Sequence, residues 1–307
     1  ADKVIAYASG LESGKVLSVC KHFPGHGDTD VDSHKALPVL PFTRERLDSV
    51  ELYPFKEAIR AGVSGMMVGH LQVPVIEPIG DLPSSLSRNV VYGLLTEELA
   101  FKGLIFTDAL AMKGVAGNKS VCLQALQAGN DMVLAPRRLK EEMDAVLEAV
   151  EKGELPEEEI NAKCRKVLTY KYILGLERKP FVKLSGLGTR INTPQTRDLI
   201  SRLNLAAITV LNNKNDVLPL HPDLKEAAIL NVGKPEEIEP FDRKMKKYTS
   251  FARFQLRKDL PEAEQQKLRD SLAAYRRVIV TVTEQRLAPY QSFFAKFAPE
   301  SPVIYVF

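Results

Sequence analysis

The stretch VLSVCKHFPGHGDTDVDSH, residues 16–34, joins a short apolar run to a polar loop crowded with histidine and aspartate. The apolar part, which ends at Phe23, has the length and composition of a buried strand. Pro24, Gly25 and Gly27 then indicate a loop. Residues 21–34 hold three histidines and three aspartates, side chains that can bind ligands and exchange protons. The stretch therefore predicts a strand that leads into a functional loop.

Three further apolar runs repeat this pattern, with amphipathic stretches of helical period between them. The runs are VSGMMVGH (63–70), GLIFTDAL (103–110) and NDMVLAP (130–136). In the stretch before the second of these, Ser87 can cap a helix with one apolar face. Four strand–helix units in a row predict an α/β fold with a parallel sheet.

Each predicted strand ends in polar or charged residues. His70 closes the second strand, Asp108 closes the third, and Arg137 follows the fourth. In parallel α/β barrels the functional groups lie at the carboxyl ends of the strands and in the loops that follow. These positions therefore predict an active site along one edge of the sheet.

The pattern changes after residue 176. The segment ERKPFVKLSGLGTRINTP (177–194) carries prolines and glycines without a clear period and predicts a surface linker. Beyond it, TRDLISRLNLAAITVLNN (196–213) predicts a helix that runs into a strand, and strands are predicted in AAILNVG, RRVIVTVTE and SPVIYVF. We expect a first domain at 1–176, a linker at 177–194 and a second domain at 195–307. The sequence stops on an apolar strand, which suggests that the second domain is truncated.

The motif KHFPGHGDTDVDSH, together with LIFTDALAM (104–112) and QALQAGNDMVLAP (124–136), closely resembles the β-N-acetylglucosaminidases of glycoside hydrolase family 3. The resemblance implies the second half of a TIM-type (β/α)8 barrel followed by a second α/β sandwich-type domain. A complete barrel needs about 250 residues and eight strands. We therefore expect the first half of the barrel to be supplied in cis or by a partner chain.

The resemblance also implies roles for individual residues. Asp108 corresponds to the nucleophile of a retaining mechanism, and His34 with Asp32 corresponds to an acid/base pair on a mobile loop. Lys21 and His22 correspond to a pair that binds sugar hydroxyls. His70 resembles a position near the sugar, although a buried histidine at a strand end is equally often a hydrogen-bonded core group.

Composition excludes several classes of partner. The net charge of +3, from 42 basic and 39 acidic residues, gives no electrostatic reason to expect nucleic acid, and no apolar run is long enough to cross a bilayer. The three cysteines are scattered and predict no disulfide framework. The spacing of Asp28 and Asp30 fits no common metal loop, so we expect neither a metal nor a cofactor. The sequence leaves the compartment open, either bacterial cytoplasm or cell envelope.

Three functions follow as alternatives. The first is a retaining exo-β-N-acetylglucosaminidase that removes terminal N-acetylglucosamine, with peptidoglycan fragments as the expected substrate. The second is a β-N-acetylglucosaminide phosphorylase, because a histidine acid/base leaves less negative charge beside the anomeric carbon and an anion such as phosphate could replace water. The third is a fragment that binds sugar without turnover.

Overall fold

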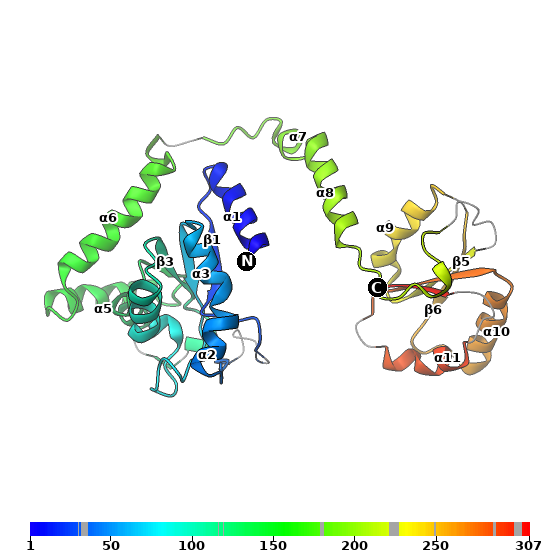
Figure 1. Cartoon of the computed structure of the whole chain (residues 1–307), viewed down its shortest axis with the longest axis horizontal. Helices are drawn as coiled ribbons and strands as arrows, with labels where there is room; N and C mark the ends of the chain where they lie inside the picture. Colours follow the sequence, from blue (N-terminus) through cyan, green and yellow to red (C-terminus); the bar gives the residue numbers. More distant parts are fainter. Residues whose placement is uncertain are drawn as a thin grey trace. The chain divides into compact units, whose positions relative to one another are not determined.

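A computed structural model shows two compact units, Ala1–Leu184 and Ser185–Phe307 (Figure 1). The residues it describes are 1–29, 31, 36–115, 117–118, 120–178, 181–220, 227–248, 250–284, 287–297 and 303–307. The division falls inside the segment predicted as a linker, where two short helices occur, η5 (Leu176–Arg178) and α7 (Leu187–Ile191).

The first unit is built on four parallel strands. They are β1 (Val19–Phe23), β2 (Gly65–Val68), β3 (Leu104–Ala109) and β4 (Met132–Leu134). Their order in the sheet is β1-β2-β3-β4, so each strand lies beside the next one along the chain. This single direction of winding is that of a (β/α)8 barrel, in which parallel strands follow one another around the axis. The α/β class and the parallel sheet are confirmed.

Helices connect these strands along the chain. Those of the first unit are α1 (Asp2–Ser13), α2 (Arg44–Arg46), η1 (Leu47–Glu51), α3 (Tyr53–Arg60), η2 (Ser84–Leu86), η3 (Asn89–Glu98), η4 (Lys113–Val115), α4 (Val121–Ala128), α5 (Leu139–Glu151) and α6 (Glu157–Ile173). The predicted cap at Ser87 is present, because its Oγ accepts a hydrogen bond from the Val90 amide at 3.2 Å.

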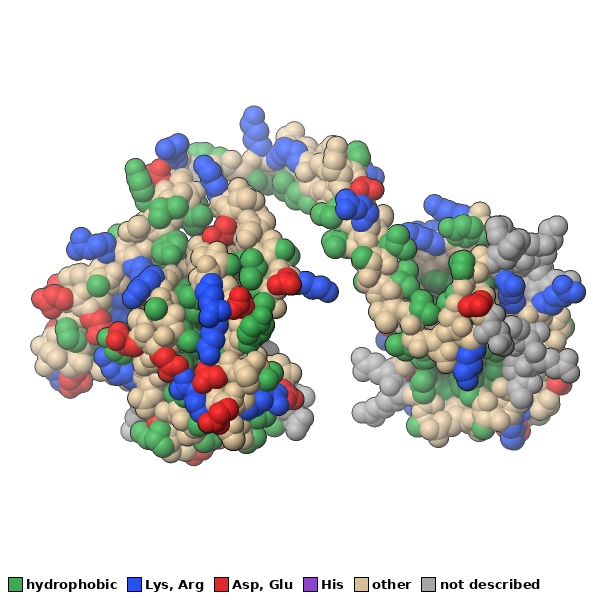
Figure 2. Space-filling model, in the orientation of Figure 1, with side chains coloured by type: hydrophobic (Ala, Val, Ile, Leu, Met, Phe, Trp, Pro, Cys, Tyr) green, Lys and Arg blue, Asp and Glu red, His purple; other side chains and the backbone are tan. Residues whose placement is uncertain are grey.

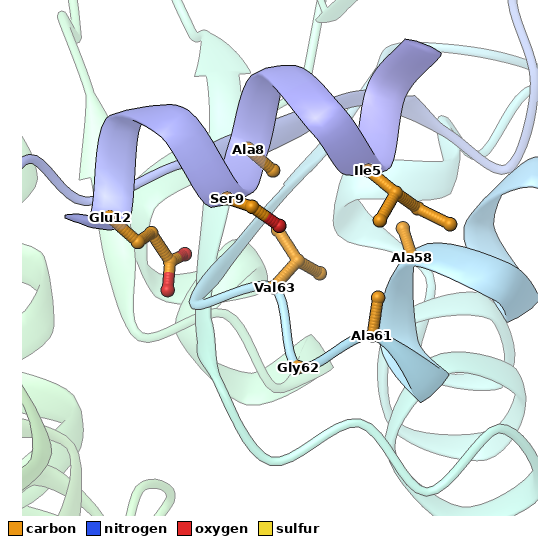
Figure 3. Close-up of a pocket in the computed structure, with 8 residues that line it drawn as sticks. All are labelled: Ile5, Ala8, Ser9, Glu12, Ala58, Ala61, Gly62 and Val63. Atoms are coloured by element: carbon orange, nitrogen blue, oxygen red, sulfur yellow. The ribbon is translucent and has the colours of Figure 1, made fainter. Parts of the chain in front are cut away.

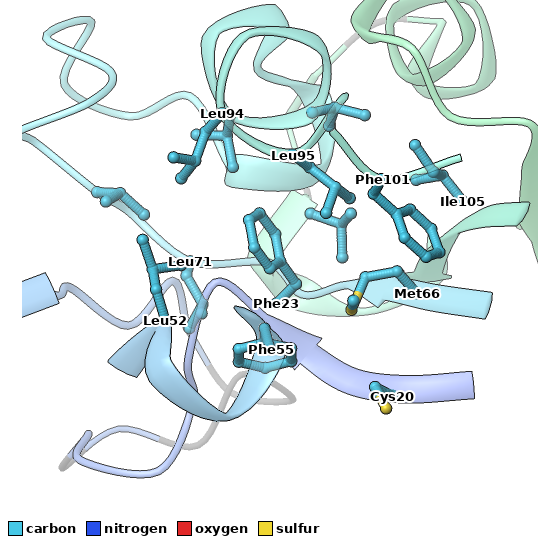
Figure 4. Packing of buried hydrophobic residues seen from close by; sticks show 14 of the residues in the cluster. Cys20, Phe23, Leu52, Phe55, Met66, Leu71, Leu94, Leu95, Phe101 and Ile105 are labelled. Carbon is cyan, nitrogen blue, oxygen red and sulfur yellow. The ribbon is translucent and has the colours of Figure 1, made fainter. Parts of the chain in front are cut away.

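The main core lies between the sheet and the helices α3 and η3 (Figure 4). Phe23 from β1 is fully buried and meets the ring of Phe55 edge-on, with 5.4 Å between the ring centroids. Met66 from β2 and Leu95 from η3 are also fully buried in this cluster. Phe23 thereby anchors the end of β1 at the point where the polar loop begins.

The second unit has a different winding. Its strands are β5 (Ala227–Val232), β6 (Ala252–Leu256), β7 (Arg277–Val282) and β8 (Val303–Val306), all parallel, in the order β6-β5-β7-β8. The chain therefore adds strands on both sides of β5, as in doubly wound α/β folds. Its helices are α8 (Pro194–Ala207), η6 (Lys214–Asp216), α9 (Pro235–Met245), α10 (Glu262–Ala273), η7 (Ala288–Tyr290) and α11 (Gln291–Lys296).

Two details of the second unit differ from the sequence prediction. Strand β6 was not predicted, because ARFQL is short, carries an arginine and lies at the edge of its sheet. The strand expected after α8 is wrong, since residues 208–213 are irregular and Leu211 is largely exposed. A β-branched run without a neighbouring strand or a covering core does not form a stable strand.

Candidate functional site

The carboxyl ends of β1, β2 and β3 bring predicted site residues together. Lys21 and His22 lie on β1, His70 follows β2, and Asp108 lies on β3. Because the three strands are parallel neighbours, their carboxyl ends form one edge of the sheet. Lys21 is exposed there, whereas His70 is fully buried.

His22 and Asp108 face each other across the end of β2. The Nε2 atom of His22 lies 3.4 Å from Oδ2 of Asp108, and both side chains are largely buried. The other carboxylate oxygen, Oδ1, accepts a hydrogen bond from the Ala109 amide at 2.8 Å. Thus a backbone amide binds one carboxylate oxygen of Asp108, and the other oxygen faces the imidazole of His22.

Gly69 makes this contact possible. It lies between the two strands that carry His22 and Asp108, and a β-carbon built on it would lie 3.1 Å from Cβ of His22. Such a distance is shorter than ordinary van der Waals contact. The absent side chain at position 69 therefore leaves room for His22 to reach over β2.

The pKa of His22 lies below its ordinary value. Burial is the largest cause, because it disfavours the charged imidazolium. Asp108 opposes this effect, while the nearby Lys21 and His26 add to it. His22 is therefore neutral at neutral pH, and it can form hydrogen bonds without adding a second cation beside Lys21.

His70 uses both ring nitrogens within the protein. Its Nε2 lies 3.1 Å from the Ala109 carbonyl oxygen, and its Nδ1 lies 2.7 Å from Oγ of Ser85. Burial is the main cause of its lowered pKa. Of the two roles that the sequence left open for His70, these contacts favour the hydrogen-bonded core group.

The predicted acid/base pair, Asp32 and His34, lies outside the described residues, as does Asp30. The part of the loop next to β1 is ordered by local contacts. His26 Nδ1 lies 2.7 Å from Oγ1 of Thr29, and Arg46 from α2 donates to Asp28 at 2.9 Å. The roles of Asp32 and His34 stay predictions.

The sequence predicted only some of the polar residues that support the site. Asn130, which precedes β4, is fully buried and donates from Nδ2 to the carbonyl oxygens of Ser85 and Ala125, both at 2.8 Å. Arg137 donates twice to the Ala111 carbonyl, at 2.9 and 2.7 Å. The place of Arg137 after a strand predicted its presence at this edge, whereas no role was predicted for Ser85 or for Asn130, although Asn130 opens the run NDMVLAP.

Two other features of the described residues are a small cavity and the distribution of surface charge. A cavity of about 20 Å³ between α1 and the end of α3, lined by residues such as Ala8, Glu12 and Val63, has room for about one water (Figure 3). Acidic and basic side chains are interspersed on the visible face of the first unit (Figure 2). The part of the chain that the structure describes holds no cluster of metal-binding side chains and no helix that could span a membrane.

Comparison with known proteins gives a consistent result. Residues 2–170 match the glycosyl hydrolase family 3 N-terminal domain. The chain is 32% identical over 238 residues to beta-hexosaminidase A of Pseudoalteromonas piscicida, which covers 70% of this chain and 39% of that protein. It is 42% identical over 129 residues to a beta-hexosaminidase of Nitrosospira multiformis, covering 41% of this chain and 36% of that protein.

A solved structure also resembles the chain. It is a glycoside hydrolase family 3 beta-N-acetylglucosaminidase from Paenibacillus sp. str. FPU-7, with a TM-score of 0.78 and 30% identity. The match covers 98% of this chain and 60% of that chain. This chain thus spans less than half the length of the two curated relatives and about three fifths of the solved one.

Proposed function

Since this chain belongs to glycosyl hydrolase family 3, we propose that it acts as a retaining exo-β-N-acetylglucosaminidase on terminal β-linked N-acetylglucosamine. The observation that carries the proposal is Asp108 at the end of β3, with Oδ1 bonded to a backbone amide and Oδ2 facing His22. The names of the relatives, beta-hexosaminidase and beta-N-acetylglucosaminidase, support the sugar. Peptidoglycan fragments are the proposed source of that sugar.

The proposed reaction has two steps. In the first, a carboxylate oxygen of Asp108 attacks the anomeric carbon and forms a glycosyl-enzyme ester, while the departing sugar takes a proton from His34. In the second, His34 removes a proton from water, which attacks the same carbon and releases Asp108. Asp32 would orient the imidazole of His34 and stabilise its charged form.

Lys21 and His22 are proposed to hold the sugar. The exposed ammonium group of Lys21 can donate to hydroxyl oxygens as a point charge. The neutral imidazole of His22 can donate or accept through one nitrogen, and its position 3.4 Å from Asp108 would set the sugar next to the nucleophile.

We also propose that four further strands complete the barrel, in cis or as a partner chain. Strands β1 and β4 form the two edges of the described sheet. Helix α6 has no buried residue, and Leu168, Tyr172 and Ile173 on it are exposed. Eight parallel strands close a barrel and cover such surfaces. Adding a separately produced upstream half should slow hydrogen exchange in β1 and β4, and unchanged exchange would contradict this proposal.

The mechanism is tested by trapping the glycosyl-enzyme. The protein is incubated with a fluorinated N-acetylglucosaminyl fluoride, and intact mass is followed by peptide mapping. We expect one added sugar on Asp108 and none in the Asp108→Asn variant. An adduct on another residue would overturn the assignment of the nucleophile. A folded protein that binds N-acetylglucosamine but is never labelled, even with an upstream half supplied, would support binding without turnover.

The same protein distinguishes hydrolysis from phosphorolysis. In phosphate buffer a hydrolase releases free N-acetylglucosamine, whereas a phosphorylase releases the sugar 1-phosphate. We expect the free sugar as the main product, because the family members that the chain resembles are named as hexosaminidases.

A further inference from the structure

A series of buried hydrogen bonds connects the start of β4 with the carboxyl ends of β2 and β3, behind the nucleophile. Asn130 before β4 donates to the Ser85 carbonyl, the Ser85 hydroxyl lies 2.7 Å from Nδ1 of His70, and Nε2 of His70 lies 3.1 Å from the Ala109 carbonyl. Asn130, Ser85 and His70 are all fully buried. The last hydrogen bond of the series is made to Ala109, the residue that follows Asp108.

These contacts fix the tautomer of His70. A carbonyl oxygen can only accept, so Nε2 must carry the proton and donate to Ala109. Burial lowers the pKa of His70 and so favours the neutral ring, in which Nδ1 is an acceptor and the Ser85 hydroxyl donates to it. The imidazole is neutral and has no nitrogen left for a ligand.

Ala109 is held on both sides as a result. Its carbonyl accepts from His70, and its amide donates to Oδ1 of Asp108 at 2.8 Å. Displacement of this one residue would therefore move the donor that orients the nucleophilic carboxylate. Misplacing a reacting group by about 1 Å can cost about 100-fold in rate.

We propose that His70 is a positioning residue, which holds the Ala109 backbone so that Asp108 keeps the orientation needed for attack. The inference rests on the proposed function of Asp108. It assigns His70 an effect on the chemical step and no contact with the sugar.

Two substitutions distinguish the roles of the two ring nitrogens of His70. In His70→Gln the side-chain amide nitrogen can take the place of Nε2 and still donate to Ala109, because the same number of bonds joins it to the backbone. In His70→Asn the shorter amide reaches only the place of Nδ1, near Ser85, and the bond to Ala109 is lost. The two variants are both polar and uncharged, so they are matched controls for each other.

Kinetic measurements on the active protein test the proposal. We expect His70→Asn to lower kcat by at least about tenfold, the effect of losing one buried hydrogen bond, with KM changed less than about threefold. His70→Gln should recover most of that loss at an equal melting temperature. Equal kcat in the two folded variants would overturn the proposal. A raised KM with unchanged kcat would overturn it as well, and would identify His70 as a sugar ligand.

A second measurement does not depend on activity. The 15N chemical shifts of the His70 ring in this chain should show a neutral imidazole protonated on Nε2, and in Ser85→Ala they should shift at Nδ1. A proton on Nδ1 instead would overturn the proposal. If the wild-type protein is never labelled on Asp108, the proposed function fails by itself, and the ring spectrum still decides whether His70 donates to Ala109.

Discussion

Gly69 is the residue whose lack of a side chain shapes the site most directly. Substituting Gly69→Ala would place a methyl group 3.1 Å from Cβ of His22, so His22 must shift from its place beside Asp108. We expect the rate of labelling of Asp108 to fall by about tenfold, while the melting temperature changes little because Gly69 lies at the end of β2. The rate is measured by mass spectrometry against time.

Gly10 offers a matched control for that substitution. It lies in α1, and a β-carbon built on it meets no atom within 4 Å. Gly10→Ala should therefore leave labelling unchanged. If Asp108 is labelled as fast in Gly69→Ala as in Gly10→Ala, the space beside His22 at position 69 does not affect the reaction.

His70 also makes the stability of the fold depend on pH. Burial lowers its pKa from 6.5, so the unfolded chain binds more protons than the folded chain at pH values just below 6.5. The free energy of unfolding should therefore fall as the pH drops below 6.5, and this contribution should be fully present above it. His70→Gln, which cannot titrate, should show a shallower fall in urea titrations at a series of pH values. If the free energy of unfolding changes equally with pH in the wild type and in His70→Gln, burial does not lower the pKa of His70.

For single residues, the sequence predicted the place on the sheet better than the side-chain contacts. His22, His70 and Asp108 could be placed at one edge because the apolar runs fix where parallel strands end. Two contacts could not be predicted: the close approach of His22 to Gly69 and the hydrogen bond between Ser85 and His70. They depend on how the segment after β2 folds back over the sheet. Such contacts join residues 15 or more positions apart, and no local pattern specifies them.

Among the elements, the long connection between β2 and η3 depends on one buried carboxylate. Glu77 accepts hydrogen bonds from the Ser87 hydroxyl at 2.7 Å, from Asn89 Nδ2 at 3.1 Å and from the Ile79 amide at 3.2 Å. The connection also carries Ser85, the partner of His70. Glu77 therefore stabilises both the start of η3 and the segment behind the site.

Removing this carboxylate should destabilise the first unit. In Glu77→Ala the buried Ser87 hydroxyl loses its acceptor, which costs about 1–3 kcal/mol, whereas the exposed Asn89 and Ile79 can bond to water instead. We expect a loss of about 2 kcal/mol in the free energy of unfolding, measured by urea denaturation. Glu148→Ala serves as control, because Glu148 forms only an exposed pair with Lys152 on α5 and should change stability by less than about 0.5 kcal/mol. Equal effects of the two substitutions would show that Glu77 has no special role.

The local sequence pattern predicts buried strands more reliably than edge strands or irregular segments. Buried strands such as β5, in which every residue is buried, were predicted because continuous apolar runs have few other solutions. Edge strand β6 is present but was not predicted, whereas the segment after α8 was predicted as a strand and is irregular. In both cases the deciding factor was the neighbouring strand or its absence, which the residues of the segment itself do not encode.

For the whole molecule, each unit has apolar clusters of its own, which predicts that each can fold independently. The clusters of the first unit include Phe23 and Leu95, and those of the second include Ile229 and Val280. Residues 185–307 expressed alone should therefore keep slow hydrogen exchange in β5 and β7, the two central strands of their sheet.

Limited proteolysis tests the same separation in the intact chain. Arg178 is 85% exposed, next to the division between the units, so trypsin should cut there before it cuts inside either core. Two resistant fragments should result, 1–178 and 179–307, each of which contains the strands of one unit. A fragment 185–307 without protected amides, or degradation of one unit as soon as the other is cut, would mean that the second core needs the first. In that case the two units would fold as one cooperative structure.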